Sequence, residues 1–80
     1  MRDNAAAHRF ELDEAGQIVF ADYRRAEGQI FIDHVEAPMS LRGTGAGGRL
    51  MAAIVRQARE EDAKIVPICG YAAAWLRRHS

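Results

Sequence analysis

The fold is decided by the stretch Leu41-Arg42-Gly43-Thr44-Gly45-Ala46-Gly47-Gly48, which contains four glycines. A β-forming run that ends at Val35 precedes it, and residues 49–63 follow with apolar side chains at helical spacing. Glycine lets the backbone turn tightly and approach a ligand without a Cβ atom in the way. The start of a helix adds unpaired N–H groups and the positive end of the helix dipole. The stretch therefore predicts a phosphate-binding loop, most naturally for a pyrophosphate.

Two common phosphate motifs fit this stretch poorly. A P-loop requires Lys followed by Ser or Thr after its last glycine, whereas Gly48 is followed by Arg49 and Leu50. Residues 43–48 do match the dinucleotide pattern G-x-G-x-x-G, but that pattern also requires an acidic residue about twenty positions later. No acidic residue follows Asp62, and a chain of 80 residues is too short for a doubly wound sheet. Both motifs are therefore disfavoured.

A third pattern, R/Q-x-x-G-x-G/A, is matched by Arg42, Gly45 and Gly47 after the extended segment 35–38. This pattern resembles the acetyl-CoA loop of the GCN5-related N-acetyltransferases. The very small branch of that superfamily combines such a loop with a His on the preceding strand, a Pro-x-Cys segment, an aromatic residue and a closing helix that ends near a His. The matching residues here are His34, Pro67-Ile68-Cys69, Tyr71, Trp75 and His79.

The resemblance implies a cofactor, acetyl-CoA or coenzyme A, and a set of residues that bind it. The pantetheine arm would lie where strands 30–35 and 64–67 splay apart, and this splay would open towards His34, Val35 and Cys69. The ring of Tyr71 could stack on adenine, although an aromatic residue at this spacing also suits the core. The expected cofactor-binding residues are Val35, Arg42, Gly43, Thr44, Gly45, Ala46, Gly47, Gly48 and Tyr71.

Cys69 and His34 are the expected catalytic residues, mainly on the strength of the resemblance. Cys69 precedes the last predicted helix, whose N–H groups and dipole favour a thiolate that could take the acetyl group. A free cysteine is also often no more than a small buried side chain. His34 could relay a proton from the incoming amine, because imidazole exchanges protons near neutral pH. It could equally satisfy local hydrogen bonds at the end of a strand.

The pattern along the chain predicts a small α+β fold. After a loosely ordered lead-in at residues 1–7, three runs rich in β-forming residues predict an antiparallel meander. The third run is apolar on both sides, which favours a central strand covered on two faces. A crossover helix should place a short fourth strand parallel to the third, before a C-terminal helix. The predicted elements are strands 8–12, 17–24 and 29–35, helix 49–63, strand 64–67 and helix 71–79.

Length and composition indicate a single folded domain over residues 1–80, with 49% hydrophobic residues. The formal net charge of +0 gives no reason to expect binding to nucleic acid or to an anionic membrane. The lone cysteine excludes an internal disulfide, and no His, Cys and Asp spacing predicts a metal site. We find no apolar run of bilayer length and no signal peptide, and therefore expect a cytoplasmic protein. We expect a monomer or weak dimer.

Three functions remain open at this point. The first is an N-acetyltransferase that moves an acetyl group from acetyl-CoA to an amine of a small molecule or a protein. The second is an acyl-CoA-binding or sensing module without useful turnover. The third is a small interaction domain in which the glycine loop is purely structural. The sequence does not identify the acceptor amine.

Overall fold

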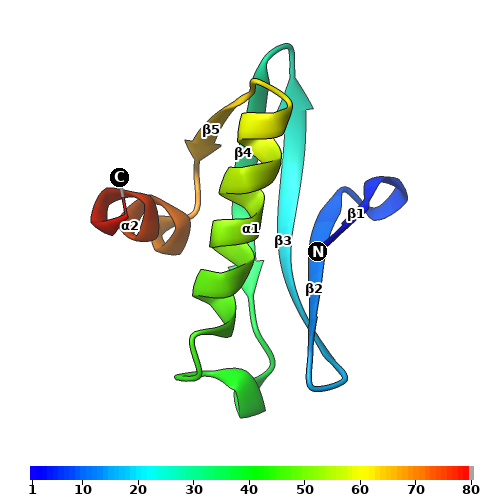
Figure 1. Cartoon of the computed structure of the whole chain (residues 1–80), viewed down its shortest axis with the longest axis vertical. Helices are drawn as coiled ribbons and strands as arrows, with labels where there is room; N and C mark the ends of the chain where they lie inside the picture. Colours follow the sequence, from blue (N-terminus) through cyan, green and yellow to red (C-terminus); the bar gives the residue numbers. More distant parts are fainter. Residues whose placement is uncertain (80) are drawn as a thin grey trace.

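Strands β2 (Arg9–Glu14), β3 (Gln17–Ala26) and β4 (Gln29–Glu36) form the antiparallel meander that the sequence predicts. The computed structural model describes residues 1–79. Within these residues the meander is the middle of a five-stranded sheet with the order β1-β2-β3-β4-β5 (Figure 1). The predicted α+β class is confirmed, with one strand more than expected.

The extra strand comes from residues 1–7, which were expected to be a loosely ordered lead-in. β1 (Arg2–Asn4) pairs antiparallel with β2, and the 3-10 turn η1 (Ala5–Ala7) connects the two strands. Side chains rather than an apolar pattern hold β1 in place. Arg2 is ion-paired with Glu11 of β2, and the Tyr23 hydroxyl of β3 donates a hydrogen bond to Asp3. The expectation was wrong because these partners come together only in the folded sheet.

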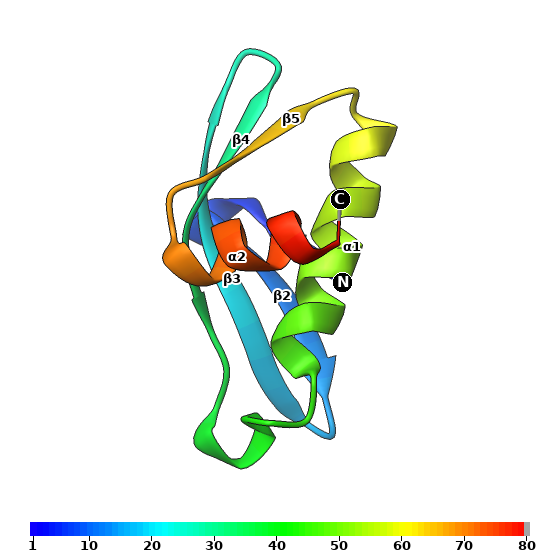
Figure 2. The same cartoon turned by 90° about the vertical axis from the view of Figure 1, so that its left-hand side faces the viewer.

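β5 (Lys64–Pro67) pairs parallel with β4, as the predicted crossover requires. α2 (Gly70–Arg78) follows and lies beside the long crossover helix (Figure 2). It buries Ala72 completely and packs Trp75 and Leu76 against the core. Within residues 1–79, neither α-helix is long and apolar enough to cross a membrane.

The crossover helix, α1 (Ala46–Glu60), covers one face of the sheet (Figure 2). Every fourth or third residue along it is apolar, so that one stripe of the helix can face the strands. Burial of that stripe removes apolar surface from water and is the main stabilising contribution to this fold. The core combines Leu50, Met51, Ile54 and Ala58 of α1 with Phe10, Val19, Ala21, Tyr23, Ile30 and Ile32 of the strands.

α1 both begins and ends earlier than the predicted helix 49–63. Gly47 and Gly48 have poor helix propensity, yet they lie in its first turn because packing against α2 outweighs propensity. At the other end, Asp62 takes a positive φ of 56°, which the helix cannot continue through. The Ala63 N–H then donates to the Ala58 carbonyl at 2.8 Å and closes the helix as in a Schellman motif.

The second face of the sheet carries no helix within residues 1–79, so the prediction that β4 is covered on two faces was wrong (Figure 2). Two arginine side chains shield the aromatic rings on this face. The Arg9 guanidinium lies 3.7 Å from the ring centroid of Phe20, and that of Arg24 lies 4.9 Å from that of Phe31. Cation–π contacts of this kind let apolar rings sit on a solvated face.

A charged cluster ties β1 and β3 to the end of α1. Arg25 donates to Asp3 at 3.1 Å and is also ion-paired with Glu61. Hydrogen bonds from Arg25, and secondly from Gln57, hold the pKa of Glu61 below its ordinary value of 4.5. A carboxyl group with a lowered pKa stabilises the fold above its unfolded pKa, and that contribution is lost as the pH falls through its folded pKa.

Replacing Arg25 by methionine should therefore lower the free energy of unfolding by about 1 kcal/mol near neutral pH, since the cluster is only partly exposed. The difference from the parent should shrink as the pH falls below 4.5 and through the lowered folded-state pKa of Glu61, because protonation of Glu61 removes its ion pair with Arg25. Urea unfolding at several pH values measures this. Arg56→Met is the matched control, because Arg56 has no ion pair within residues 1–79. Equal urea midpoints for Arg25→Met and the parent would show that the cluster does not stabilise the fold.

Candidate functional site

A cleft of about 520 Å³ lies where the end of β4, the glycine loop and the start of α2 meet. It brings together residues from three separate parts of the sequence, and most of the predicted site residues are among them. Its lining consists of His34, Val35, Glu36, Ala37, Leu41, Arg42, Gly43, Gly45, Ala46, Gly47 and Tyr71. Three predicted site residues, Thr44, Gly48 and Cys69, do not line it.

One wall of the cleft is the end of β4, which continues beyond its partner strand. The last parallel pair joins Ile32 to Pro67, whereas β4 runs on to Glu36. Residues 33–36 therefore have no strand beside them on the β5 side within the described part of the chain. A β-bulge also places an extra residue, Asp33, between the partners of Asp22 and Tyr23. The edge of β4 is thus open because β5 ends at Pro67, not because two paired strands splay apart, and an extended polar ligand could hydrogen-bond to this edge.

The opposite wall is the glycine loop, which follows the 3-10 turn η2 (Met39–Leu41). Gly43 and Gly45 have φ values of 80° and 85°, which other residues adopt only with strain. Gly45 is the N-cap of α1 and offers no side chain to cap the helix. The first helical hydrogen bond runs from the Arg49 N–H to the Gly45 carbonyl at 3.0 Å.

The amides before that bond are consequently free donors. The N–H groups of Ala46, Gly47 and Gly48 have no hydrogen-bond acceptor among residues 1–79. They stand at the positive end of the α1 dipole, and Ala46 and Gly47 line the cleft. Arg42, exposed at the same wall, adds a guanidinium whose Nε lies 3.5 Å from the Ala37 carbonyl. This arrangement can bind a phosphate or pyrophosphate group.

Two residues that the sequence analysis did not identify, Glu14 and Arg49, hold the glycine loop in position. Arg49 donates to the Glu14 carboxylate through Nε at 3.0 Å and Nη2 at 2.6 Å, and its Nη1 donates to the Thr44 carbonyl at 3.0 Å. The hydrogen bond from Arg49 holds the pKa of Glu14 below its ordinary value. Glu14 is the last residue of β2, far from Arg49 in the sequence, so only the fold reveals their contact. The position of Arg49 directly after the glycines was the one sequence signal that could have pointed to it.

Gly47 and Gly48 allow α2 to approach α1. A Cβ atom on Gly47 would lie 2.7 Å from the Tyr71 hydroxyl oxygen, and one on Gly48 would lie 3.1 Å from Trp75 Nε1. Tyr71 remains 43% exposed and lines the cleft, whereas Trp75 packs against the core. Gly48 therefore leaves the space that the contact between α1 and α2 requires. Tyr71 is the aromatic residue that lines the cleft.

His34 and Glu36 form a pair at the cleft. They are two residues apart on β4, so their side chains share a face, and His34 Nε2 lies 3.1 Å from Glu36 Oε1. Both side chains are about half exposed, at 52% and 54%. A carboxylate that holds one ring nitrogen orients the imidazole. The pair can accept a proton from a bound ligand.

Cys69 is partly buried against the core and is the N-cap of α2, as its predicted position before the last helix implied. Its backbone N–H donates to the Ile32 carbonyl at 3.0 Å, which places the residue where the pairing of β4 with β5 ends. Thr44 turns its hydroxyl back to the Leu41 carbonyl. Neither side chain reaches the lining of the cleft.

Residues 9–80 match the sequence model of a family described as GCN5-related N-acetyl-transferase. No curated protein matches the chain. The family match spans β4, the glycine loop, β5 and α2, and thus every element that builds the site. The chain belongs to the GCN5-related N-acetyltransferase family.

Proposed function

We propose that this protein is an acetyl-CoA-dependent N-acetyltransferase that moves an acetyl group from coenzyme A to an amine. Membership of the family indicates acyl transfer in general, and its members generally use acetyl-CoA. The observation that carries the proposal is that free amides at the start of α1 and the open edge of β4 face the same cleft.

The types and the positions of the residues in the cleft match the chemical groups of acetyl-CoA. The N–H groups of Ala46 and Gly47, with the Arg42 guanidinium, would hold the pyrophosphate. The unpaired backbone of residues 33–36 would hydrogen-bond the amides of the pantetheine arm. Tyr71 could cover the adenine. When bound, acetyl-CoA supplies a thioester whose acetyl group can pass to a neutral amine.

The chain would contribute proton transfer to this reaction. An amine attacks only as the free base, so a proton must leave it, and the imidazole of His34 with Glu36 beside it could accept that proton. The departing thiolate needs a proton in turn. Cys69 adjoins the point where the pairing of β4 with β5 ends and could donate one or, as an alternative, take up the acetyl group itself.

A second candidate is a coenzyme A-binding module without turnover. It is favoured by the position of Cys69 outside the lining of the cleft and by the exposure of His34. Calorimetry with acetyl-CoA and with coenzyme A tests the binding that both candidates require. Release of coenzyme A with a panel of small and peptide amines then separates the two, and Cys69→Ala in the same assay tests the thiol.

Gly45→Ala should fold but bind coenzyme A at least about tenfold more weakly than the parent, because a charged hydrogen bond is worth about 1.5–3 kcal/mol. The new Cβ would lie 3.1 Å from Arg49 Nη1, and the φ of 85° is strained for alanine. The loop amides would therefore turn away from the pyrophosphate. Calorimetry measures the affinity.

Gly28→Ala is the control for this change, because Gly28 has a similar φ of 71° in the β3–β4 turn, away from the cleft. Both variants should lose a similar amount of stability, about 1–2 kcal/mol. Only Gly45→Ala should lose affinity. If Gly45→Ala binds coenzyme A as tightly as Gly28→Ala does, the loop does not hold the pyrophosphate.

His34→Gln should lower kcat for the best amine about a hundredfold, the lower end of what a general base contributes, while the affinity for coenzyme A stays unchanged. Added imidazole should restore part of the lost rate. The control is His8→Asn, which removes an imidazole outside the cleft lining at a φ of 53° that asparagine tolerates. Full activity of His34→Gln in steady-state kinetics would exclude His34 as the base.

A further inference from the structure

A second cleft, of about 710 Å³, lies between the later turns of α1, β5 and α2. Its walls are largely apolar and include Val55, Ile65, Trp75 and Leu76. It shares no lining residue with the first cleft. The close approach of Trp75 to Gly48 lies between the two, where α2 meets the first turn of α1. Clefts of roughly 300–1,000 Å³ with apolar walls and a few polar groups are typical of small-molecule sites.

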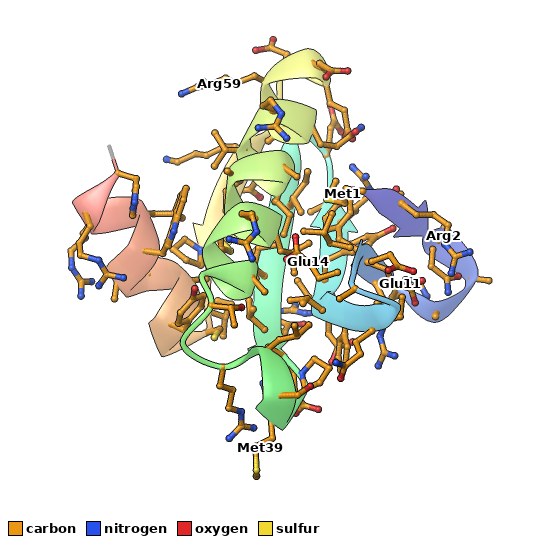
Figure 3. All side chains as sticks on the ribbon, turned by 60° about the horizontal axis from the view of Figure 1, so that its bottom comes forward. Met1, Arg2, Glu11, Glu14, Met39 and Arg59 are labelled. Atoms are coloured by element: carbon orange, nitrogen blue, oxygen red, sulfur yellow. The ribbon has the colours of Figure 1, made fainter. Side chains whose placement is uncertain are left out.

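The polar groups at this cleft are basic. Arg56 and Arg59 line it from α1, and no carboxylate is among its lining residues. Figure 3 shows the Arg59 side chain leaving α1 on the side where α2 lies. Neither arginine has an ion pair or hydrogen bond within residues 1–79. By contrast, the arginines Arg2, Arg9, Arg24, Arg25 and Arg49 are all paired with carboxylates.

The surroundings add to this positive potential. No Asp or Glu follows Asp62 in the sequence, so β5 and α2 contribute no negative charge. His79 completes the polar edge of the cleft: its ring stacks on Trp75 at 4.0 Å, and its Nδ1 lies 2.8 Å from the Trp75 carbonyl. This contact fixes the ring and leaves Nε2 without a partner among the described residues. A cleft lined by one sign of charge concentrates ligands of the opposite sign.

We infer that this second cleft binds an aliphatic carboxylate. The hydrocarbon chain would lie on the apolar walls, and the carboxylate would accept hydrogen bonds from the guanidinium groups of Arg56 and Arg59. The planar guanidinium matches a carboxylate better than any other side chain does, which makes two unpaired arginines beside an apolar wall a suitable site. This inference is independent of the proposed acetyl transfer, because the two clefts are separate.

Trp75 provides the measurement, because it is the only tryptophan in the chain and it lines the cleft. Its fluorescence should respond to decanoate below the micelle concentration and reach saturation. Decanol, with the same number of carbon atoms and no charge, should bind more weakly, and decyltrimethylammonium should bind most weakly. Equal affinities for the three would contradict the inference, since the cleft would then be merely apolar. A response to polyglutamate but not to decanoate would assign the cleft to an acidic polypeptide and would also contradict it.

Arg59→Glu and Arg78→Glu form a matched pair, because each reverses one charge in the last turn of a helix. Of these two arginines, Arg59 lines the cleft and Arg78 does not. Arg59→Glu should therefore weaken decanoate binding at least about tenfold, and Arg78→Glu should weaken it much less. Arg56→Glu should act like Arg59→Glu. Equal effects of Arg59→Glu and Arg78→Glu would overturn the proposed contact.

Competition with coenzyme A tests whether decanoate binds in the second cleft or in the first. At a saturating concentration coenzyme A should leave the decanoate affinity unchanged, whereas displacement of decanoate would place the ligand in the first cleft and overturn the inference. If coenzyme A does not bind the protein at all, the proposed acetyltransferase function fails. Decanoate binding that depends on Arg59 would still support the second site.

Discussion

The carbonyl oxygen of Ile32 accepts hydrogen bonds from the N–H groups of both Ile68 and Cys69, each at 3.0 Å. This double contact ends β5 directly after Pro67 and turns the chain into α2. Because β4 continues past that point, its edge is left open beside the glycine loop. The same turn brings Tyr71 to the first cleft and Trp75 to the first turn of α1. Both clefts therefore depend on where β5 stops.

The glycine loop meets two separate requirements. Gly43 and Gly45 supply positive φ angles, and Gly47 and Gly48 supply space for α2. The contact of Arg49 with Glu14 and with the Thr44 carbonyl links this loop to the turn between β2 and β3. An exposed ion pair of this kind adds little to overall stability. Its consequence is local: it fixes the direction of the free amides before a ligand arrives, so that less ordering is needed on binding.

The sequence predicted the meander, the crossover helix, the parallel fourth strand and the last helix. These elements could be predicted because the periodicity of apolar residues and the presence of turn residues are local signals. It could not predict β1, whose contacts, such as Arg2 with Glu11, are made only in the folded sheet. It placed the start of α1 too late, since Gly47 and Gly48 disfavour a helix until α2 packs on them. Most of the expected cofactor-binding residues line one cleft, yet Cys69, which was expected to be catalytic, does not. That difference depends on side-chain direction at a helix N-cap, which spacing along the chain does not determine.

Amide-resolved NMR during a titration with coenzyme A tests most directly the central claim that the glycine loop and the open edge of β4 form one binding site. We predict that the amide signals of Gly45, Ala46, Gly47 and Gly48 shift together with those of residues 33–36, at one common affinity. Gly28, in the turn at the other end of β4, should not shift. The absence of shifts in the loop, or shifts in the loop without any in residues 33–36, would contradict the account.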